Sequence, residues 1–253
     1  MSDARSPTAL QALRARIAAI EAHGQAPRGV LPFGVAALDA SLPEGGLLRG
    51  ALHEVAGGGQ GMLDASCATL FAAGILARCP GPVLWCLTKA DLFAPALAQA
   101  GLDPDRVIYV EAADDKAVMA CFEEGLRHGG LGGVVAEVAR LSMLTSRRLQ
   151  LAAERTGTIG IAVRRWRRPA DAADFGQPTA AVTRWRISAL PSAPLPVPGV
   201  GRARWLVELI RNRAGECADF MMEACDETGH LGVFANLAHG SLAPPAGQRQ
   251  AVA

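Results

Sequence analysis

Residues 53–66 read HEVAGGGQGMLDAS and decide the fold, because they join two segments of different character. The run ALHEVA, residues 51–56, is typical of a β-strand, and the run ATLFAAGILA, residues 68–77, is typical of a helix. A strand, a glycine-rich turn and a helix form the setting of a phosphate-binding loop. In such a loop backbone N–H groups surround a phosphate, and the helix N-terminus adds the positive end of its dipole.

The side chains that a nucleotide-hydrolysing loop needs are missing from this one. The full motif G-x-x-x-x-G-K-[ST] requires a lysine for the β- and γ-phosphates and a hydroxyl for Mg²⁺. Here Met62 and Leu63 follow the last glycine, and neither can supply those groups. We therefore expect no cofactor and no ATPase activity, although weak nucleotide binding to the backbone amides stays open. The residues of this vestigial phosphate loop are Gly57, Gly58, Gly59 and Gly61.

The composition is that of a globular protein with a sizeable core. Half of the 253 residues are hydrophobic and only 19% are charged, which argues against broad disorder. No run approaches the roughly 18 apolar residues of a membrane span, and the polar, basic N-terminus does not resemble a signal peptide. The six cysteines form no C-x-x-C pair, so we expect buried free thiols in a cytoplasmic protein rather than a zinc site.

Strands and helices alternate along residues 51–166, which predicts βαβ units and a parallel sheet. The expected strands are 51–56, 83–87, 106–111, 132–141 and 158–166, and the expected helices are 63–78, 90–101, 114–129 and 142–157. Past Pro169 the pattern changes, and residues 179–190, 203–213 and 218–236 read as antiparallel strands added to the edge of that sheet.

Arginine is concentrated in the second half of the chain. Residues 140–213 hold 14 Arg against four acidic residues, in a chain whose net charge is only +1. This asymmetry predicts an acidic or polyanionic partner for the second half.

Arg and Trp interleave at residues 164–168, 184–186 and 202–205, and both residue types are enriched in interfaces. Arg also suits phosphate contacts, so direct or indirect DNA contact is possible. Alternation along a strand favours a core position for Trp185 and Trp205. The run at 164–168 ends a strand where open α/β sheets place their sites, although a solvated strand end is the alternative. The candidate interaction residues are Arg164, Arg165, Trp166, Arg167, Arg168, Arg202 and Arg204.

The N-terminal segment has apolar residues at helical spacing, which predicts an amphipathic helix. Its apolar stripe consists of Leu10, Leu13, Ile17 and Ile20. The helix either packs on its own domain or docks on a neighbouring molecule, and the residues leave both alternatives open. The predicted division is an N-terminal helix and linker at 1–28, a core domain at 29–238 and a disordered tail at 239–253.

The stretch FGVAALDASLPEGGLLRGALHEV, residues 33–55, resembles the core of the RecA recombinase. The resemblance continues through residues 83–107 and 132–141, and covers about residues 8–235. It implies a RecA-like three-layer α/β fold, with a mostly parallel central sheet, antiparallel strands at the C-terminal edge and an N-terminal helix.

The departures from the RecA pattern concern its hydrolytic residues. The family's phosphate-loop Lys and Thr fall on Met62 and Leu63, and its Mg²⁺-ordering Asp falls on Ala136, next to Glu137. Its catalytic Glu falls near Thr88 or Lys89. Because phosphoryl transfer depends on all of these parts, their joint replacement predicts a protein that is not an enzyme.

The stretch GVGRARWLVELIRNR, residues 199–213, together with the degenerate loop, is similar to the ImuA family of bacterial SOS mutagenesis cassettes. The resemblance implies an accessory protein of error-prone translesion synthesis, cytoplasmic and associated with the nucleoid on DNA damage. Its implied partners are RecA, an ImuB-type Y-family polymerase homologue and an error-prone replicative-type polymerase complex, with no membrane involved.

Two alternative functions stay open at this point. One is a cell-division inhibitor like SulA, a related RecA-like family that also lacks ATPase residues. The other is an atypical nucleotide-dependent DNA-binding protein, in which Glu137 substitutes for the missing Asp.

Overall fold

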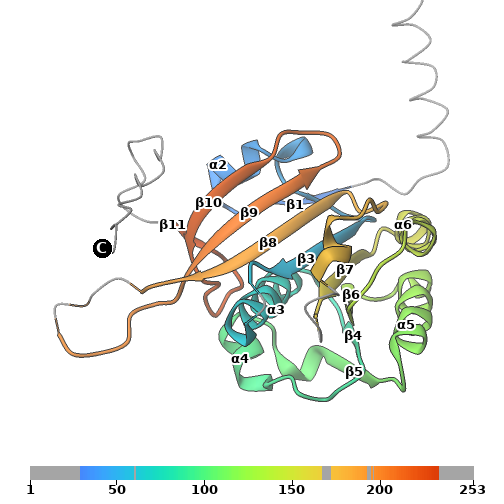
Figure 1. Cartoon of the computed structure of the whole chain (residues 1–253), viewed down its shortest axis with the longest axis horizontal. Helices are drawn as coiled ribbons and strands as arrows, with labels where there is room; N and C mark the ends of the chain where they lie inside the picture. Colours follow the sequence, from blue (N-terminus) through green and yellow to red (C-terminus); the bar gives the residue numbers. More distant parts are fainter. Residues whose placement is uncertain (1–28, 60, 167–171, 193–194, 196, 234–253) are drawn as a thin grey trace, which may run out of the picture.

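A single large sheet organises the computed structural model, which describes residues 29–59, 61–166, 172–192, 195 and 197–233 (Figure 1). The nine strands follow the order β11-β10-β9-β8-β3-β7-β6-β4-β5. Their bounds are β3 Leu52–Gly57, β4 Val83–Leu87, β5 Val107–Glu111, β6 Gly133–Val138, β7 Ile159–Arg164, β8 Thr183–Leu190, β9 Arg204–Asn212, β10 Ala218–Glu223 and β11 Gly232–Val233.

Helices cover both faces of this sheet and make three layers (Figure 1). Side chains alternate along β3, so Val55 packs into a core shared with α3 while Leu52 packs into a second core shared with α5 and α6. The helices are α2 Ala36–Ala40, α3 Met62–Ala77, α4 Ala94–Gln99, α5 Asp115–His128 and α6 Met143–Thr156, with short 3-10 turns at η1 Pro43–Gly45, η2 Pro104–Arg106 and η3 Ala173–Gly176. None of the helices in the described part of the chain is long and apolar enough to span a membrane.

The aromatic core confirms the prediction for two tryptophans. Trp185 is fully buried and contacts Phe33 and Phe71, with ring centroids 5.6 Å from each. Trp205 is 1% exposed and belongs to the same core. Neither indole is available as a platform for a nucleic-acid base.

Strand β8 corrects the prediction that all strands after Pro169 are antiparallel. It lies beside β3 in parallel, with Trp185 opposite Val55. The connection at residues 165–182 is long enough to carry the chain back across the sheet before β8 begins, as a parallel pairing requires. Antiparallel pairing starts only at β9 and continues through β10 and β11.

Most other elements lie where the sequence predicts them. Asp114 caps α5 by accepting a hydrogen bond from Ala117 N at 2.8 Å, as expected. The helix expected at 90–101 is shorter, because it begins only at Ala94. Pro95 lies in its first turn, where the missing N–H costs no helical hydrogen bond.

Two features differ from the predictions, and two predicted segments cannot be compared with the structure. A two-stranded antiparallel sheet, β1 (Val30–Leu31) with β2 (Leu47–Leu48), precedes β3 and was not predicted. All six cysteines are free, but Cys217 is exposed rather than buried. The predicted N-terminal helix with Leu10, Leu13, Ile17 and Ile20, and the tail at 239–253, lie outside the described residues.

Candidate functional site

The glycine loop between β3 and α3 is fastened to the neighbouring strand β8. Gly58 N donates to the Ile187 carbonyl at 2.8 Å, and Ala189 N donates to Asp64 Oδ1 at 2.8 Å. At Gly57 an added Cβ would lie 2.8 Å from the backbone carbon of Asp64, so only glycine lets α3 start this close to the strand. These contacts therefore hold the start of the loop and the first turn of α3 against β8.

Asp64 places a carboxylate inside this loop. It lies in the first turn of α3, and an added Cβ on Gly59 would be 2.6 Å from its Oδ2. A helix N-terminus favours a negative charge there, whether it comes from a phosphate or from a side chain. The Asp64 carboxylate, which accepts from Ala189 N, therefore adds a negative charge beside the glycine loop. Met62 and Leu63 point outward and are 88% and 69% exposed.

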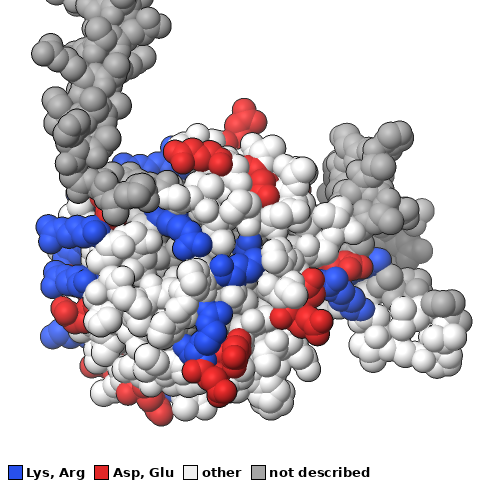
Figure 2. Space-filling view, turned by 180° about the vertical axis from the view of Figure 1, so that it is seen from behind, with Lys and Arg blue, Asp and Glu red and all other residues white. Residues whose placement is uncertain are grey.

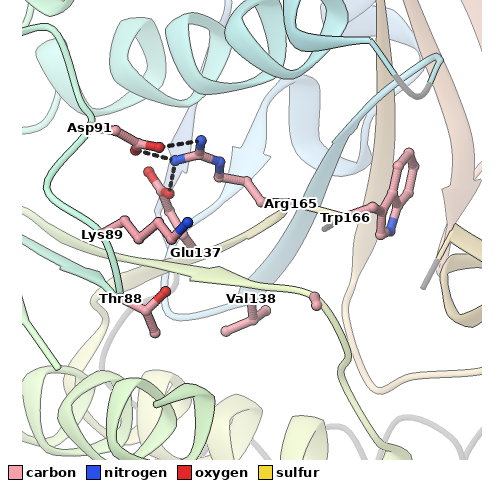
Figure 3. Close-up of a pocket in the computed structure, with 8 residues that line it drawn as sticks. Thr88, Lys89, Asp91, Glu137, Val138, Arg165 and Trp166 are labelled. Atoms are coloured by element: carbon pink, nitrogen blue, oxygen red, sulfur yellow. Dashed lines mark hydrogen bonds and ion pairs between the residues drawn. The ribbon is translucent and has the colours of Figure 1, made fainter. Parts of the chain in front are cut away.

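A small cavity of about 130 Å³ lies where β4, β6 and β7 end (Figure 3). Open α/β sheets bind their ligands at this edge. The cavity brings together residues that are far apart in the sequence, including Thr88 and Lys89, near which the resemblance places the family's catalytic Glu. Its lining consists of Thr88, Lys89, Asp91, Glu137, Val138, Ala139, Arg165 and Trp166.

The guanidinium of Arg165 fills the polar centre of the cavity (Figure 3). Its Nη1 and Nη2 contact the two carboxylate oxygens of Asp91 at 2.6 and 3.0 Å, and Nη1 also contacts Glu137 Oε2 at 2.6 Å. The hydrogen bonds from Arg165 hold the pKa of Asp91 below its ordinary value. Two carboxylates and one guanidinium therefore form a closed ion-pair cluster, strengthened by the bidentate geometry.

Glu137 has both of its oxygens engaged. Trp85 Nε1 donates to Oε1 at 3.0 Å, Arg165 holds Oε2, and the residue is only 5% exposed. A carboxylate whose two oxygens are both engaged in this way does not suit the role of a Mg²⁺ ligand. The nucleotide-dependent alternative required Glu137 to take that role. Within the described residues no group of His, Cys, Asp or Glu side chains could hold a metal ion.

The Arg-Trp run at 164–168 does not form one surface, which corrects the prediction for its first member. Arg164 is 1% exposed, because its side chain enters the interior and pairs with Glu54 Oε2 at 2.9 Å. Arg165 enters the cavity described above. Trp166 packs edge-on against Phe175, with ring centroids 5.7 Å apart. Arg167 and Arg168 lie outside the described residues.

Arg164 belongs to a buried cluster of charges between β3, β7 and β8. Glu54 Oε1 accepts from Arg184 Nη2 at 3.0 Å while its Oε2 accepts from Arg164. Asp174 also pairs with Arg164, and both guanidinium groups lie over the ring of Phe175 at 5.8 and 5.0 Å. The cluster anchors the segment after β7 to the central strand.

The third Arg-Trp stretch lies at the β9–β10 end of the sheet. Arg202 is exposed, and it contacts Glu223 at 3.2 Å and the carbonyl of Ala224 at 3.1 Å. Arg204 is half-buried at the start of β9. Neither residue lines the cavity, and their role as interaction residues stays a prediction.

Burial of His53 predicts a pH dependence of folding. Its ring nitrogens lie 2.7 Å from Thr183 Oγ1 and 2.9 Å from the Leu48 carbonyl. Burial lowers the pKa of His53 from 6.5 to about 4, so the unfolded chain binds an extra proton between those values. The free energy of unfolding should therefore fall as the pH drops below 6.5, by about 2 kcal/mol between pH 8 and pH 5.

Urea unfolding at the two pH values measures this loss. In the His53→Gln variant, the difference in the free energy of unfolding between pH 8 and pH 5 should shrink by about 2 kcal/mol. The matched control is His230→Gln, because His230 is exposed and should leave the difference unchanged. Equal pH dependence in the wild type and in His53→Gln would contradict the assignment.

Comparison with known proteins shows similarity to curated proteins in sequence and to solved structures in fold. No protein-family model matches the sequence. The chain is 37% identical over 221 residues to "Protein ImuA" of Caulobacter vibrioides, covering 83% of this chain and 89% of that protein, and the match is the same in two strains. The crystal structure of the RadB recombinase matches with a TM-score of 0.50 and 16% identity, over 81% of this chain and 99% of that one. The RadB likeness shows the fold alone, and it confirms the predicted RecA-like α/β architecture.

Proposed function

The chain belongs to the ImuA family, and from this premise we propose that it is a non-catalytic, RecA-like accessory protein of SOS mutagenesis. In this proposal it acts in the cytoplasm as an adaptor for error-prone translesion synthesis. Its partners are RecA, an ImuB-type Y-family polymerase homologue and an error-prone replicative-type polymerase complex. DNA is contacted weakly or through these partners.

One observation supports the proposal: charged side chains beside the glycine loop and at the ends of β4, β6 and β7 are held by contacts within the chain. Asp64 puts a carboxylate into the glycine loop, and Arg165 puts a guanidinium between Asp91 and Glu137. Catalysis of phosphoryl transfer requires free charged groups aimed at the transferred phosphate. A RecA-like scaffold whose charges are paired with one another supports binding to proteins rather than turnover of ATP.

The surface around the closed loop is apolar and suits a protein partner. Met62 and Phe93 are 88% and 69% exposed and line a cavity of about 300 Å³ between α3 and α4, and Leu63, the neighbour of Met62 in the sequence, is 69% exposed. Leu92 and Leu97 line the same cavity. Exposed apolar patches of this kind mark interaction sites, and stable complexes use the most hydrophobic interfaces. We assign this surface to the ImuB-type partner.

Replacing Leu63 with aspartate should weaken binding of the ImuB-type partner at least about tenfold, because a charge would be desolvated in an apolar interface. Leu63 is exposed, so the melting temperature should stay within about 2 °C of the wild type. Surface plasmon resonance with the purified full-length partner measures the effect. Val200→Asp is the matched control, because Val200 is 96% exposed in the β8–β9 connection and does not line the cavity. Equal binding by Leu63→Asp and wild type would contradict this assignment.

A further inference from the structure

A basic groove lies on the other face of the sheet from the glycine loop, between α6 and the end of β9. Its cavity volume is about 460 Å³. One wall is a stripe of α6 that includes Met143, Arg147 and Leu151, and the opposite wall carries Arg211 and Arg213. Positions 143, 147, 150, 151 and 154 fall on one helical face, which explains why residues spread over three turns meet in one groove.

The arginines of this groove are available to a ligand. Arg147 and Arg213 are exposed, and within the described part of the chain neither makes an ion pair. Arg211 is oriented by a hydrogen bond from its Nη1 to the Thr179 carbonyl at 2.6 Å. Glu154 is the one acidic residue in the lining, so the groove as a whole is positive. Figure 2 shows Lys and Arg side chains gathered over the side of the molecule where α5 and α6 lie.

The groove also offers aliphatic surface but no aromatic ring. Leu151 is 57% exposed, and Met143 lines the groove one turn before Arg147. Sites for single-stranded nucleic acid combine basic grooves with aromatic side chains on which bases stack, and among the described residues no Trp, Tyr or Phe lines this groove. Guanidinium groups bind carboxylates in bidentate fashion, and aliphatic side chains bind apolar ones. The combination favours a peptide over a nucleic acid.

The chain's own ends do not match this groove in charge. Residues 1–28 contain four Arg and two acidic residues, and residues 234–253 contain one Arg and no acidic residue. We propose that the groove between α6 and β9 binds an acidic, amphipathic segment of a partner protein, with Arg147, Arg211 and Arg213 contacting its carboxylates and Leu151 its apolar side chains. This inference does not depend on the state of the glycine loop.

Fluorescence anisotropy with a labelled peptide tests the proposal on the full-length chain. The probe is an amphipathic helical peptide of about 20 residues built from Glu, Leu and Ala, a length that spans such a groove. Wild-type protein should bind it, with an affinity that falls as salt is raised. Arg147→Glu and Arg213→Glu should each weaken binding at least about tenfold.

The matched control is Arg155→Glu, because Arg155 is equally exposed on the same helix but does not line the groove. Arg155→Glu changes the net charge by the same amount as Arg147→Glu, and the affinity of this variant for the peptide should stay within about twofold of wild type. The proposal is overturned if wild type does not bind the peptide or if Arg155→Glu weakens binding as much as Arg147→Glu. It is also overturned if a thymidine oligonucleotide of similar length displaces the peptide and loses affinity in the same variants, since the groove is then a nucleic-acid site.

Discussion

Replacing Glu54 with alanine should lower the free energy of unfolding by about 3–5 kcal/mol, because it leaves two buried arginines without their shared carboxylate. The side chains of Glu54 and Arg164 are both 0% exposed, and that of Arg184 is 6% exposed. The Nε atoms of both arginines have no hydrogen-bond partner, so the pairs with Glu54 provide much of their compensation. Removing the carboxylate therefore leaves positive charge in a region that water does not reach.

Urea unfolding of the wild type and the Glu54→Ala variant at pH 8 measures the loss. The control is Arg202→Ala, which breaks an exposed pair with Glu223 and should cost less than about 1 kcal/mol. A double variant, Glu54→Ala with Arg164→Met, should recover part of the loss, because it removes one of the unpaired charges. A loss below about 1 kcal/mol in Glu54→Ala would show that the cluster does not hold the segment after β7 to the sheet.

Replacing Trp185 with alanine should cost about 3–5 kcal/mol, the range for deleting a large buried aromatic side chain. Its indole is fully buried against Phe33 and Phe71, and its Nε1 donates to Thr183 Oγ1 at 2.8 Å. The deletion would open a cavity where α3 packs on β8, and it would remove the donor from a buried hydroxyl.

Thermal and urea unfolding give this value, with Phe93→Ala as control. Phe93 is 69% exposed, so truncating it should change stability by no more than about 0.5 kcal/mol. If Trp185→Ala is as stable as wild type, then Trp185 is not part of the core. The prediction that Trp185 is unavailable for base stacking would then fail as well.

The alternation of strands and helices, and the apolar character of each strand, were sufficient to predict most of the fold. The buried parallel strand β4 reads as a continuous apolar run, and Asp114 marks the start of α5 through its capping side chain. The direction of β8 could not be predicted, because a strand's own sequence does not encode which neighbour it joins. That direction depends on the path of residues 165–182, a long-range property of the chain.

The candidate site was predicted only in part. The missing Lys and Ser/Thr of the loop are visible in the sequence, but the roles of Asp64 and Arg165 depend on contacts across the fold. Asp64 meets Ala189, which is 125 residues away, and Arg165 meets Asp91, which is 74 residues away. One signal was available for the buried cluster: Glu54 stands within strand β3, whose residues are all buried, and a buried acidic residue requires a partner.

The exposed or buried state of each arginine could not be assigned from the run at 164–168 alone. Arg164 faces the interior because β7 lies between β3 and β6 in the sheet, so that its side chain meets Glu54 on the neighbouring strand. Arg165 follows the last residue of the strand and turns toward the cavity instead. One step along the chain therefore separates a structural ion pair from a residue of the cavity at the ends of β4, β6 and β7.

We propose that groups of the chain itself take the place of the nucleotide and its metal. Isothermal titration calorimetry of the full-length protein with Mg²⁺-ATP tests this most directly. We predict no saturable heat up to on the order of 1 mM nucleotide. The same result is expected for Met62→Lys with Leu63→Thr, because Asp64 and Arg165 remain in place. Saturable binding by the wild type that Gly61→Glu abolishes would contradict the claim, since an added Cβ at Gly61 has no atom within 4 Å and the new charge acts on the loop alone.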